Sequence, residues 1–537
     1  MPGIVACVHP RAAEEGAKIL EAGGNAFDAA IATAFVQMIV TPFSCGVGGM
    51  VSAHLFSRAH DAHVIVDGCL RAGSQVTEDM WLDDYRGEGE FSGESLFEDY
   101  RSTMGYTSIC TPGAVAALGE VHRSFGTLPW RVLLQPAIRI ARQGFPVLPG
   151  MAQVTNEQPE PYRPSRVERL SATADCAALY LKPDGALFDA DEQLCNPAYA
   201  DTLEQLAAAG ADDFYHGELA QRIGNDLERN GAFVTRDDLA VYKPVTYAPR
   251  ATTYRDYTVY SNGAPGGGPL LLQSLNVLAG FDLTGLGHGS TEYLSHLGST
   301  LQLVNQDRRD YLGDSDFLPQ TPESVLLSTE RTAQLRAAVT AGTVGGVAPP
   351  HEHGDTTHLT VVDAAGNIAC ITHSNGNHSG VITPGMGFVY NNGMNRFDPR
   401  PGRASSFAPR KVRLHLMMPA IATRDGSPAV AWGAPGGNAI LSALVQAFSN
   451  VVDFGMTATE AVTAPRIHAE GDTIWCDARM RTDICAALRA RGFTVEQDPI
   501  SYPSRFALCQ LVTIGTDGRL DGGSDPRGEG AGIIART

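Results

Sequence analysis

The chain reads Gly354-Asp355-Thr356-Thr357-His358-Leu359-Thr360-Val361-Val362-Asp363 where a loop meets a predicted strand. The preceding residues, 342–353, are rich in glycine, proline and histidine. The following β-branched residues are typical of a strand. We interpret 342–353 as an exposed, mobile segment, where a break in the chain is tolerated. A break before Thr356 would make that residue a new N-terminus beside a folded sheet.

Thr356 acquires a chemical role if that break occurs. A threonine hydroxyl is a weak nucleophile until a base takes its proton, and an α-amine with a pKa of about 7.7–8 can be that base. Threonine activated by its own N-terminal amine is an established scheme. Before the break, the same hydroxyl can attack the Asp355 carbonyl and form an ester that water then splits. The alternative interpretation is ordinary strand composition, because threonine favours strands.

A predicted hairpin adds a second hydroxyl. Residues 357–363 and 368–374 read as strands around the turn Ala-Ala-Gly-Asn. If the turn is centred on its second residue, the numbers of paired residues add up to 730, and Thr356 faces Ser374. Directly opposed side chains come within roughly 4.5–5.5 Å, so Ser374 can hydrogen-bond the Thr356 oxygen. A register shift of one residue would put Asn375 there instead.

A glycine-rich turn offers backbone donors. Gly433-Ala-Pro-Gly-Gly-Asn438 follows a predicted strand (429–433) and precedes a predicted helix (439–449). The N–H groups of Gly436 and Gly437 can point at a developing oxyanion in such a turn. The alternative is a tight strand-to-helix connection with no chemical role.

The periodicity of the remaining chain predicts an α+β protein with helices packed on antiparallel sheets. Helical spacing dominates from 113 to 341, whereas hairpins dominate after 355. The predicted helices are 12–22, 26–40, 130–143, 202–209, 270–278 and 291–311, with Asn25 capping the second. The further predicted strands are 51–56, 62–66, 420–423 and 507–514, with one near 520.

Composition narrows the classes of partner. The 537 residues carry a formal net charge of −19, which disfavours nucleic acid and anionic membranes as partners. The longest apolar run, 29–40, is too short to span a bilayer. Ten scattered cysteines and the lack of a signal-peptide pattern lead us to expect a cytoplasmic protein with reduced thiols.

A series of motifs resembles the γ-glutamyltranspeptidase family of N-terminal-nucleophile hydrolases. The resemblance covers almost the whole chain, and the order and spacing of the motifs make it specific. The motifs are His9-Pro-Arg-Ala-Ala-Glu-Glu-Gly, Gly23-Gly-Asn-Ala-Phe-Asp-Ala-Ala-Ile-Ala, Thr111-Pro-Gly-Ala-Val, 128–145, 307–317, Thr356-Thr-His, Val361-Val-Asp, Pro435-Gly-Gly, Ala464-Pro-Arg and Ser524-Asp-Pro-Arg.

This resemblance implies a four-layer αββα fold and self-cleavage between Asp355 and Thr356. The products would be a large subunit, 1–355, and a small subunit, 356–537, that stay intertwined; a dimer of such heterodimers is an assembly that we keep open. The resemblance implies Thr356 as the nucleophile, Ser374 beside it, and an oxyanion hole at Gly436 and Gly437. It implies no cofactor or metal and a small-molecule substrate.

The substrate pocket departs from the family pattern. Cys69 stands where the family has the arginine that grips the substrate α-carboxylate, and Arg71, two residues on, is a possible substitute. Arg396 stands where the family has an acid that binds the α-ammonium group, which reverses the local charge. We therefore expect an acidic amide or acyl substrate without a free α-amino group, as for acylases of the cephalosporin (glutaryl) type. The predicted substrate-binding residues are Arg71, Arg396, Asn375 and His415.

Several alternatives stay open at this point. Arg396 can instead pair with a neighbouring acid, and the enzyme can be a true γ-glutamyl transpeptidase or glutathione hydrolase. His351, His353 and His358 around Glu352 suggest a zinc site.

Two further alternatives concern the chemistry itself. Cys45 or Cys69 is a candidate nucleophile. The third class of alternative function is a non-catalytic one, an uncleaved homologue that only binds.

Overall fold

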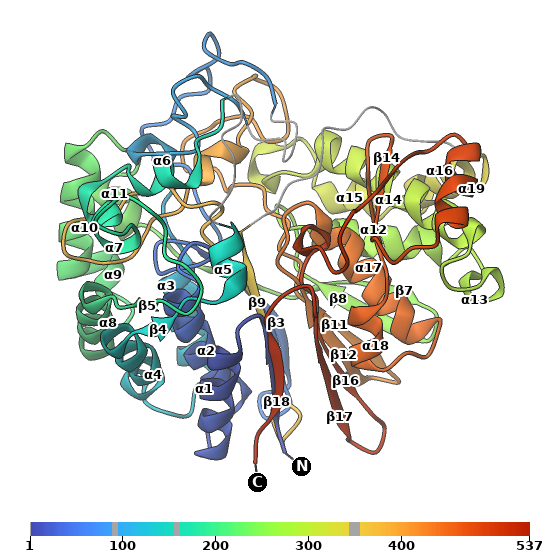
Figure 1. Cartoon of the computed structure of the whole chain (residues 1–537), viewed down its shortest axis with the longest axis horizontal. Helices are drawn as coiled ribbons and strands as arrows, with labels where there is room; N and C mark the ends of the chain where they lie inside the picture. Colours follow the sequence, from blue (N-terminus) through green and yellow to red (C-terminus); the bar gives the residue numbers. More distant parts are fainter. Residues whose placement is uncertain (1, 89–94, 155–161, 343–354, 537) are drawn as a thin grey trace.

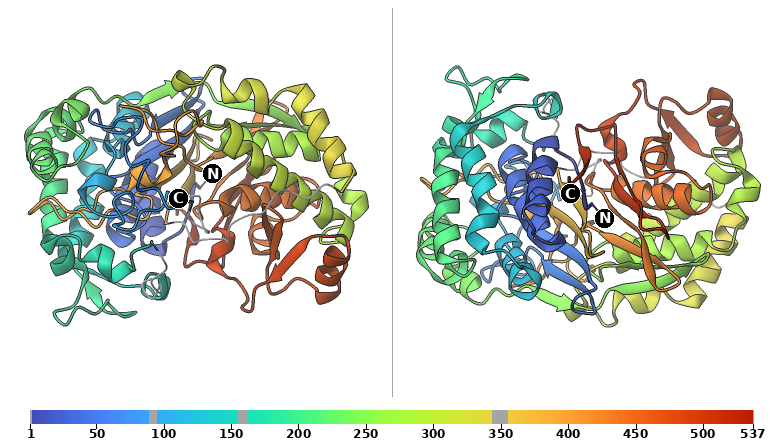
Figure 2. Two further views of the ribbon diagram at one scale, coloured as in Figure 1. Left: turned by 90° about the horizontal axis from the view of Figure 1, so that it is seen from above. Right: turned by 90° about the horizontal axis from the view of Figure 1, so that it is seen from below.

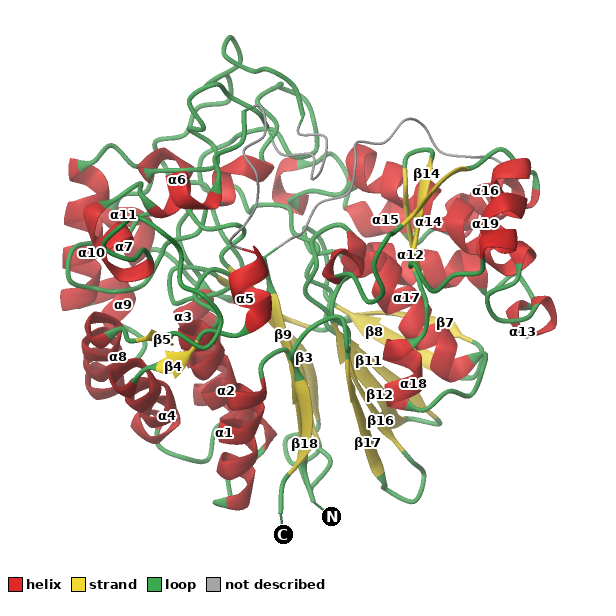
Figure 3. Ribbon diagram, viewed as in Figure 1, coloured by secondary structure: helices red, strands yellow, loops and turns green. Residues whose placement is uncertain are grey.

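Two antiparallel sheets lie face to face between two layers of helices (Figures 1 and 3). The computed structural model describes residues 2–88, 95–154, 162–342 and 355–536. One sheet has seven strands, in the order β18 (Ala531–Ile534), β1 (Ile4–Cys7), β9 (Thr357–Val362), β10 (Ile368–Ser374), β2 (Met50–Ser57), β3 (Ala62–Gly68) and β6 (Val245–Tyr247). The other has six, in the order β17 (Leu520–Ser524), β16 (Gln510–Ile514), β12 (Ser427–Gly433), β11 (Ala420–Arg424), β8 (Tyr257–Ser261) and β7 (Arg250–Tyr254).

Three buried apolar clusters bind these layers together. A cluster between the sheets includes Ile4, Val362, Ile421 and Val512, so alternate side chains of both sheets meet there. The seven-stranded sheet packs its other face on α1 (Pro10–Glu21), α2 (Ala26–Val40), α3 (Ala114–Phe125), α4 (Trp130–Gln143) and α8 (Pro197–Ala209). The six-stranded sheet packs on α12 (Gly268–Leu278), α14 (Thr291–Tyr311) and α17 (Ala439–Val452). The predicted four-layer arrangement is confirmed. Figure 2 gives views from above and from below, and in both the helices flank the two sheets.

Helix α2 fixes the strands that carry the candidate site. Asn25 and Asp28 form a capping box at its start, as expected of asparagine at this position. Every residue of α2 is buried, which explains its apolar composition on all sides. Near its end, Gln37 donates to the Thr357 hydroxyl (2.8 Å) and accepts from the His373 ring (2.8 Å). The helix thereby ties together the adjoining ends of β9 and β10.

The predicted elements agree with the structure where the hydrophobic period is long or the turn is short. The expected register of the β9–β10 hairpin is confirmed, because Ile368 pairs with Val362 and His373 with Thr357. Helices dominate from 113 to 341 as expected, but the prediction missed the short strands β6 to β8, of which β6 and β7 are edge strands and β8 lies next to β7.

The remaining elements surround the two sheets. Among the described residues, no helix is both long and apolar enough to cross a membrane. Near the two ends of the chain, β1 and β18 pair with each other. The other helices are α5 (Pro149–Val154), α6 (Arg166–Leu170), α7 (Ala174–Tyr180), α9 (Asp213–His216), α10 (Glu218–Arg229), α11 (Arg236–Ala240), α13 (Leu283–Leu286), α15 (Pro322–Leu326), α16 (Thr329–Thr340), α18 (Ala458–Thr463) and α19 (Thr482–Ala490). The other strands are β4 (Phe145–Pro146), β5 (Gln193–Leu194), β13 (Ile467–Glu470), β14 (Thr473–Cys476) and β15 (Thr494–Gln497).

Candidate active site

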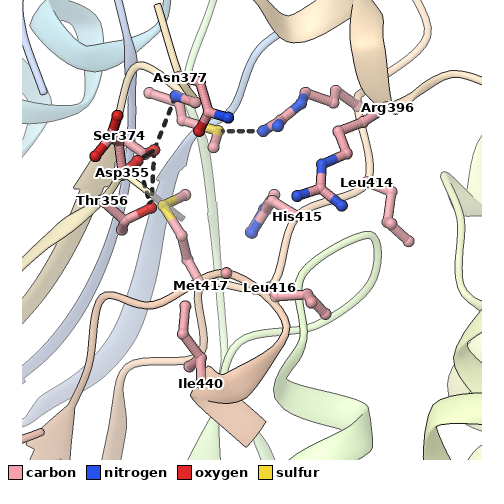
Figure 4. Close-up of a pocket in the computed structure, with 14 residues that line it drawn as sticks. Asp355, Thr356, Ser374, Asn377, Arg396, Leu414, His415, Leu416, Met417 and Ile440 are labelled. Carbon is pink, nitrogen blue, oxygen red and sulfur yellow. Dashed lines mark hydrogen bonds between the residues drawn. The ribbon is translucent and has the colours of Figure 1, made fainter. Parts of the chain in front are cut away.

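Two hydroxyl groups meet at the start of β9. Thr356 directly precedes this strand, and its Oγ1 lies 3.0 Å from the Oγ of Ser374 (Figure 4). Both hydroxyls also donate a hydrogen bond to the carbonyl oxygen of Asp355. The distance is 2.8 Å from Thr356 Oγ1 and 3.0 Å from Ser374 Oγ. Ser374 Oγ accepts the N–H of Gly376 at 2.9 Å, which holds it in place. The predicted pairing of Thr356 with Ser374 is confirmed, and the hydroxyls converge on the peptide bond that we expect to break.

An ion pair holds Asp355, the residue before Thr356. Arg166, 2% exposed, donates to the Asp355 carboxylate at 3.1 Å. Its guanidinium lies over the ring of Phe43, 5.3 Å from the centroid. A guanidinium stacked on an aromatic ring is restrained in orientation. Arg166 was not among the predicted site residues, because it comes from the distant helix α6.

The glycine turn lines the same cavities as Thr356. Gly436 and Gly437 have φ angles of 138° and 56°, in the region that favours glycine. At Gly436 a Cβ atom would also lie 2.4 Å from the Cβ of Ala507. Gly436 shares one cavity with Thr356, and Gly437 shares another. Within the described part of the chain, neither glycine N–H donates to a protein acceptor, so both remain available to a bound oxygen.

A small cavity of about 40 Å³ opens on one side of Thr356. Arg396 and Arg413 give it positive charge, and both belong to the chain after β10. Arg413 is 4% exposed and lies 3.5 Å from the sulfur of Met50. Arg413 was not among the predicted site residues. The full lining is Met50, Asp355, Thr356, Ser374, Gly376, Asn377, Arg396, Arg413, Leu414, His415, Leu416, Met417, Gly437 and Ile440 (Figure 4).

Two of the four predicted substrate-binding residues line this cavity and two do not. Arg396 and His415 are part of the lining. Arg71 instead lies over the Tyr242 ring at 5.5 Å, because β3 ends at Gly68 and strand alternation no longer applies to it. Asn375 is not part of this lining, and its side-chain amide instead donates to the Pro42 carbonyl at 3.4 Å. Neither Arg71 nor Asn375 belongs to the described lining of this cavity.

His415 is a neutral group in this cavity. Burial, assisted by the charge of Arg413, lowers its pKa to about 3. Its Nε2 lies 3.0 Å from the Sγ of Cys69. Burial, together with the charge of Asp67, raises the pKa of that thiol well above its usual value. Cys69 is therefore a thiol and His415 a neutral imidazole, and the tautomer of His415 decides which of the two donates.

These thiols are poor candidates for a nucleophile. Burial raises the pKa of Cys45 to about 12, and that of Cys69 is also far above neutral. A cysteine nucleophile acts as the thiolate, which such surroundings disfavour. The geometry thus favours Thr356 over either cysteine.

The histidines of the alternative metal site are only partly described. His351, Glu352 and His353 lie outside the described residues. The His358 ring is buried, with its nitrogens 2.8 Å from the Thr372 hydroxyl and 3.0 Å from the Thr360 hydroxyl. Over the ranges that the structure covers, no three metal-ligating side chains come together.

A second, larger cavity of about 690 Å³ also has Asp355 and Thr356 in its lining. It reaches Gly436 and runs between α2, α5 and the segment after β15. Its lining is Val8, His9, Val40, Thr41, Phe43, Ser44, Leu148, Pro149, Gly150, Met151, Arg166, Asp355, Thr356, Pro435, Gly436, Ile500, Tyr502, Pro503, Ser504, Arg505, Leu508, Pro526, Arg527, Gly528 and Glu529.

Comparison with known proteins identifies one family. The family model described as Gamma-glutamyltranspeptidase matches residues 12–535. "Acylase ACY 1 proenzyme" of Pseudomonas sp. (strain V22) is 32% identical over 544 residues, covering 99% of this chain and 93% of that protein. "Glutathione hydrolase proenzyme" of Escherichia coli (strain K12) is 29% identical over 548 residues, covering 98% and 90%. The crystal structure of cephalosporin acylase from Bacillus halodurans superposes with a TM-score of 0.87 at 28% identity, covering 99% of this chain and 95% of that one.

Proposed function

Because the chain belongs to the gamma-glutamyltranspeptidase family, we propose that it is a self-processing amidohydrolase or acyltransferase whose nucleophile is Thr356. The Thr356 hydroxyl attacks the carbonyl carbon of Asp355, the peptide C–N bond breaks, and an ester links the two residues. Water then splits the ester, leaving a carboxylate on Asp355 and an α-amine on Thr356. The products are subunits 1–355 and 356–537.

The observation that carries this proposal is the convergence of two hydroxyls on one carbonyl. Thr356 and Ser374 both contact the Asp355 oxygen, at 2.8 Å and 3.0 Å. Negative charge develops on this oxygen when the hydroxyl attacks, and a nearby donor stabilises it. Ser374 supplies that donor during processing.

The freed amine then serves as the base for substrate. It takes the proton of the Thr356 hydroxyl, and the oxygen attacks the acyl carbonyl carbon. The N–H groups of Gly436 and Gly437 stabilise the oxyanion. The C–N bond breaks as the proton passes to the leaving amine, and the acyl group remains as an ester on Thr356. Water, or a second amine, releases it.

Two arginines support an acidic acyl group as the substrate. Arg396 and Arg413 line the small cavity, where the neutral His415 adds no charge of its own. Leu414, Leu416 and Ile440 give the same cavity apolar walls. A short aliphatic chain ending in a carboxylate fits this combination, because a guanidinium binds a carboxylate in two parallel hydrogen bonds. An α-ammonium group would be repelled.

Mass analysis tests the nucleophile. Wild-type protein should separate into two fragments that meet between residues 355 and 356, whereas Thr356→Ala should stay whole. Cleavage of Thr356→Ala at the same bond would refute the proposal. An intact, inactive wild-type protein would instead favour a non-catalytic binding homologue.

A matched pair of anilides tests the substrate class. Glutaryl p-nitroanilide and γ-glutamyl p-nitroanilide differ only in the α-amino group. We expect a higher kcat/KM for the glutaryl compound, and a loss of about tenfold or more in Arg396→Gln, since a charge-assisted hydrogen bond is removed. Arg403→Gln, on the same segment but outside the lining, is the control. Preference for the γ-glutamyl compound would instead indicate a true glutathione hydrolase, as the relative from Escherichia coli is named.

Location and assembly complete the proposal. We propose a reducing, cytoplasmic compartment, which the ten free cysteines, nine of them buried, support. Recovery of the protein in a periplasmic fraction would contradict this. Light scattering on the purified protein distinguishes one heterodimer from a dimer of heterodimers.

A further inference from the structure

Two adjacent glycines form the proposed oxyanion hole, and their backbone freedom has to be restrained by neighbouring groups. Gly436 and Gly437 both have φ angles in the region that favours glycine. An oxyanion hole is effective only if its N–H groups are already directed at the oxygen before charge develops. The first turn of α17 holds both glycine carbonyls, which accept the N–H groups of Ala439 (3.1 Å) and Ile440 (3.3 Å). The side chain of Asn438 provides a further restraint.

Asn438 directly precedes α17 but does not cap it. Asparagine is common at the N-cap, where an extended backbone lets its side-chain oxygen accept an N–H of the first turn. Here the backbone is helical, with φ −66° and ψ −25°, and the side chain forms no capping bond to any described residue. The residue is 4% exposed, and its Nδ2 donates to Glu470 Oε2 at 3.2 Å. Its Oδ1 has no hydrogen-bond partner among the described residues, so this single bond orients the side chain.

Glu470 is an acceptor that is itself firmly held. It lies at the end of β13, is 5% exposed, and pairs with Arg308 of α14 at 2.6 Å. Arg309 lies 3.3 Å and His468 3.7 Å from the same carboxylate. Burial alone would raise the pKa of Glu470, but these three groups hold it well below its usual value, so the carboxylate is ionised at pH 7. A hydrogen bond to an ionised acceptor is stronger than one to a neutral group.

Strand β13 is fixed to the helix that follows the glycine turn. Gln446 of α17 donates to the Ile467 carbonyl at 2.7 Å and accepts the N–H of the same residue at 2.9 Å. Ser442 Oγ, also on α17, lies 2.8 Å from His468 Nδ1. The same strand packs on α14. Glu470 therefore has a defined position relative to the start of α17.

We propose that Asn438 is a positioning residue, whose hydrogen bond to Glu470 holds the glycine turn so that its N–H groups stay directed at the substrate oxygen. Neither side chain belongs to the described lining of the two cavities beside Thr356, so both act through the backbone of the turn. The inference rests on the proposed function. Formation and hydrolysis of the acyl-enzyme both pass through an oxyanion, so both steps depend on this bond.

Self-cleavage provides an internal comparison. In the uncleaved chain the Asp355 oxygen accepts from Thr356 and Ser374, whereas the two glycine N–H groups donate to no acceptor within the described part of the protein. A misplaced turn should therefore slow the turnover of substrate and leave processing nearly unchanged. A general loss of folding would lower both.

Asn438→Ala tests this role with glutaryl p-nitroanilide as the substrate. We expect kcat to fall about tenfold or more, because a misdirected donor loses part of the roughly hundredfold to thousandfold that a complete donor contributes. KM should stay within about twofold, since the contacts of the bound acyl group are unchanged. The rate of cleavage after residue 355, followed by mass spectrometry, should also stay within about twofold of wild type. Asn438→Asp keeps the shape and suits a helix start, but it places a carboxylate against Glu470 and should show the same fall in kcat at pH 7. It serves as the test if Asn438→Ala does not fold.

Asn450→Ala is the matched control. Asn450 lies on the same helix, is 3% exposed, and donates its amide to the Ala461 carbonyl at 3.1 Å. Its replacement should lower Tm about as much as Asn438→Ala does, with kcat within about twofold of wild type. The inference is overturned, while the proposed function stands, if a folded Asn438 variant keeps the wild-type kcat or loses cleavage and turnover in equal proportion. An equal fall in kcat in Asn450→Ala overturns it as well. A wild-type protein that is not processed and hydrolyses no glutaryl anilide refutes the proposed function itself.

Discussion

Ser374→Ala should slow the cleavage of the chain without unfolding it. The substitution removes an oxygen that lies 3.0 Å from the Asp355 carbonyl oxygen and 3.0 Å from Thr356 Oγ1. Removing one donor to a developing oxyanion costs roughly a hundredfold to a thousandfold in rate, or about 2.7–4 kcal/mol. The N–H of Gly376 also loses its acceptor, which should lower the free energy of unfolding by about 1 kcal/mol, since this group is only partly buried.

A time course by mass spectrometry measures this effect. Freshly purified wild type and Ser374→Ala are incubated together, and the fraction of chain cleaved after residue 355 is followed. Ser374→Thr is the matched control, because threonine keeps the hydroxyl and suits a strand; it should cleave within about tenfold of wild type. Thermal unfolding of the uncleaved forms measures the stability term separately. A Ser374→Ala protein that cleaves at the wild-type rate would refute the reasoning.

Three further perturbations probe the surroundings of the site. Arg166→Met should slow cleavage by about tenfold to a hundredfold, because the Asp355 carboxylate loses the partner that aims its carbonyl. Glu470→Gln should lower the free energy of unfolding by about 3 kcal/mol at pH 7, because Arg308 is left without its buried partner. Burial would raise the pKa of Glu470, but Arg308, His468 and Arg309 together hold it well below 4.5. The difference between variant and wild type should therefore persist above about pH 4.5 and shrink as the pH falls further. Iodoacetamide treatment of the native protein should leave activity unchanged, because Cys69 is buried and protonated.

Each of these three predictions has a result that would contradict it. Arg166→Lys should restore part of the rate, and an Arg166→Met protein that cleaves normally would show that the ion pair has no role in aiming the carbonyl. An acid-unfolding difference for Glu470→Gln that grows below pH 4 would reverse the assigned sign. Loss of activity in proportion to alkylation of Cys69 would return the cysteine nucleophile to consideration.

The hairpin at the nucleophile was predictable because its determinants are local. A short turn and the two-residue period of strands fix the register, and register alone brings Thr356 opposite Ser374. The same holds for α2, whose cap at Asn25 and long apolar run define both of its ends. The family motifs supplied the role of Gly436 and Gly437, which composition could not distinguish from a tight turn.

The cavities were not predictable because their walls come from distant segments. Arg166 reaches the site from α6, and Arg413 from a loop, so spacing along the chain gave no sign of either. The expectation for Arg71 failed because it extended strand alternation past Gly68, where β3 stops.

The order of strands means that the chain refolds less readily after the proposed cleavage than before it. In the seven-stranded sheet β9 lies between β1 and β10, and β10 pairs with β2, so segments from both sides of residue 355 interleave. The six-stranded sheet joins β8 to β11 across the same divide. An unprocessed chain that is denatured can refold as a single molecule. A processed one must bring two separate polypeptides together, so its recovery from denaturant should depend on protein concentration, and its working lifetime is set by how slowly it unfolds.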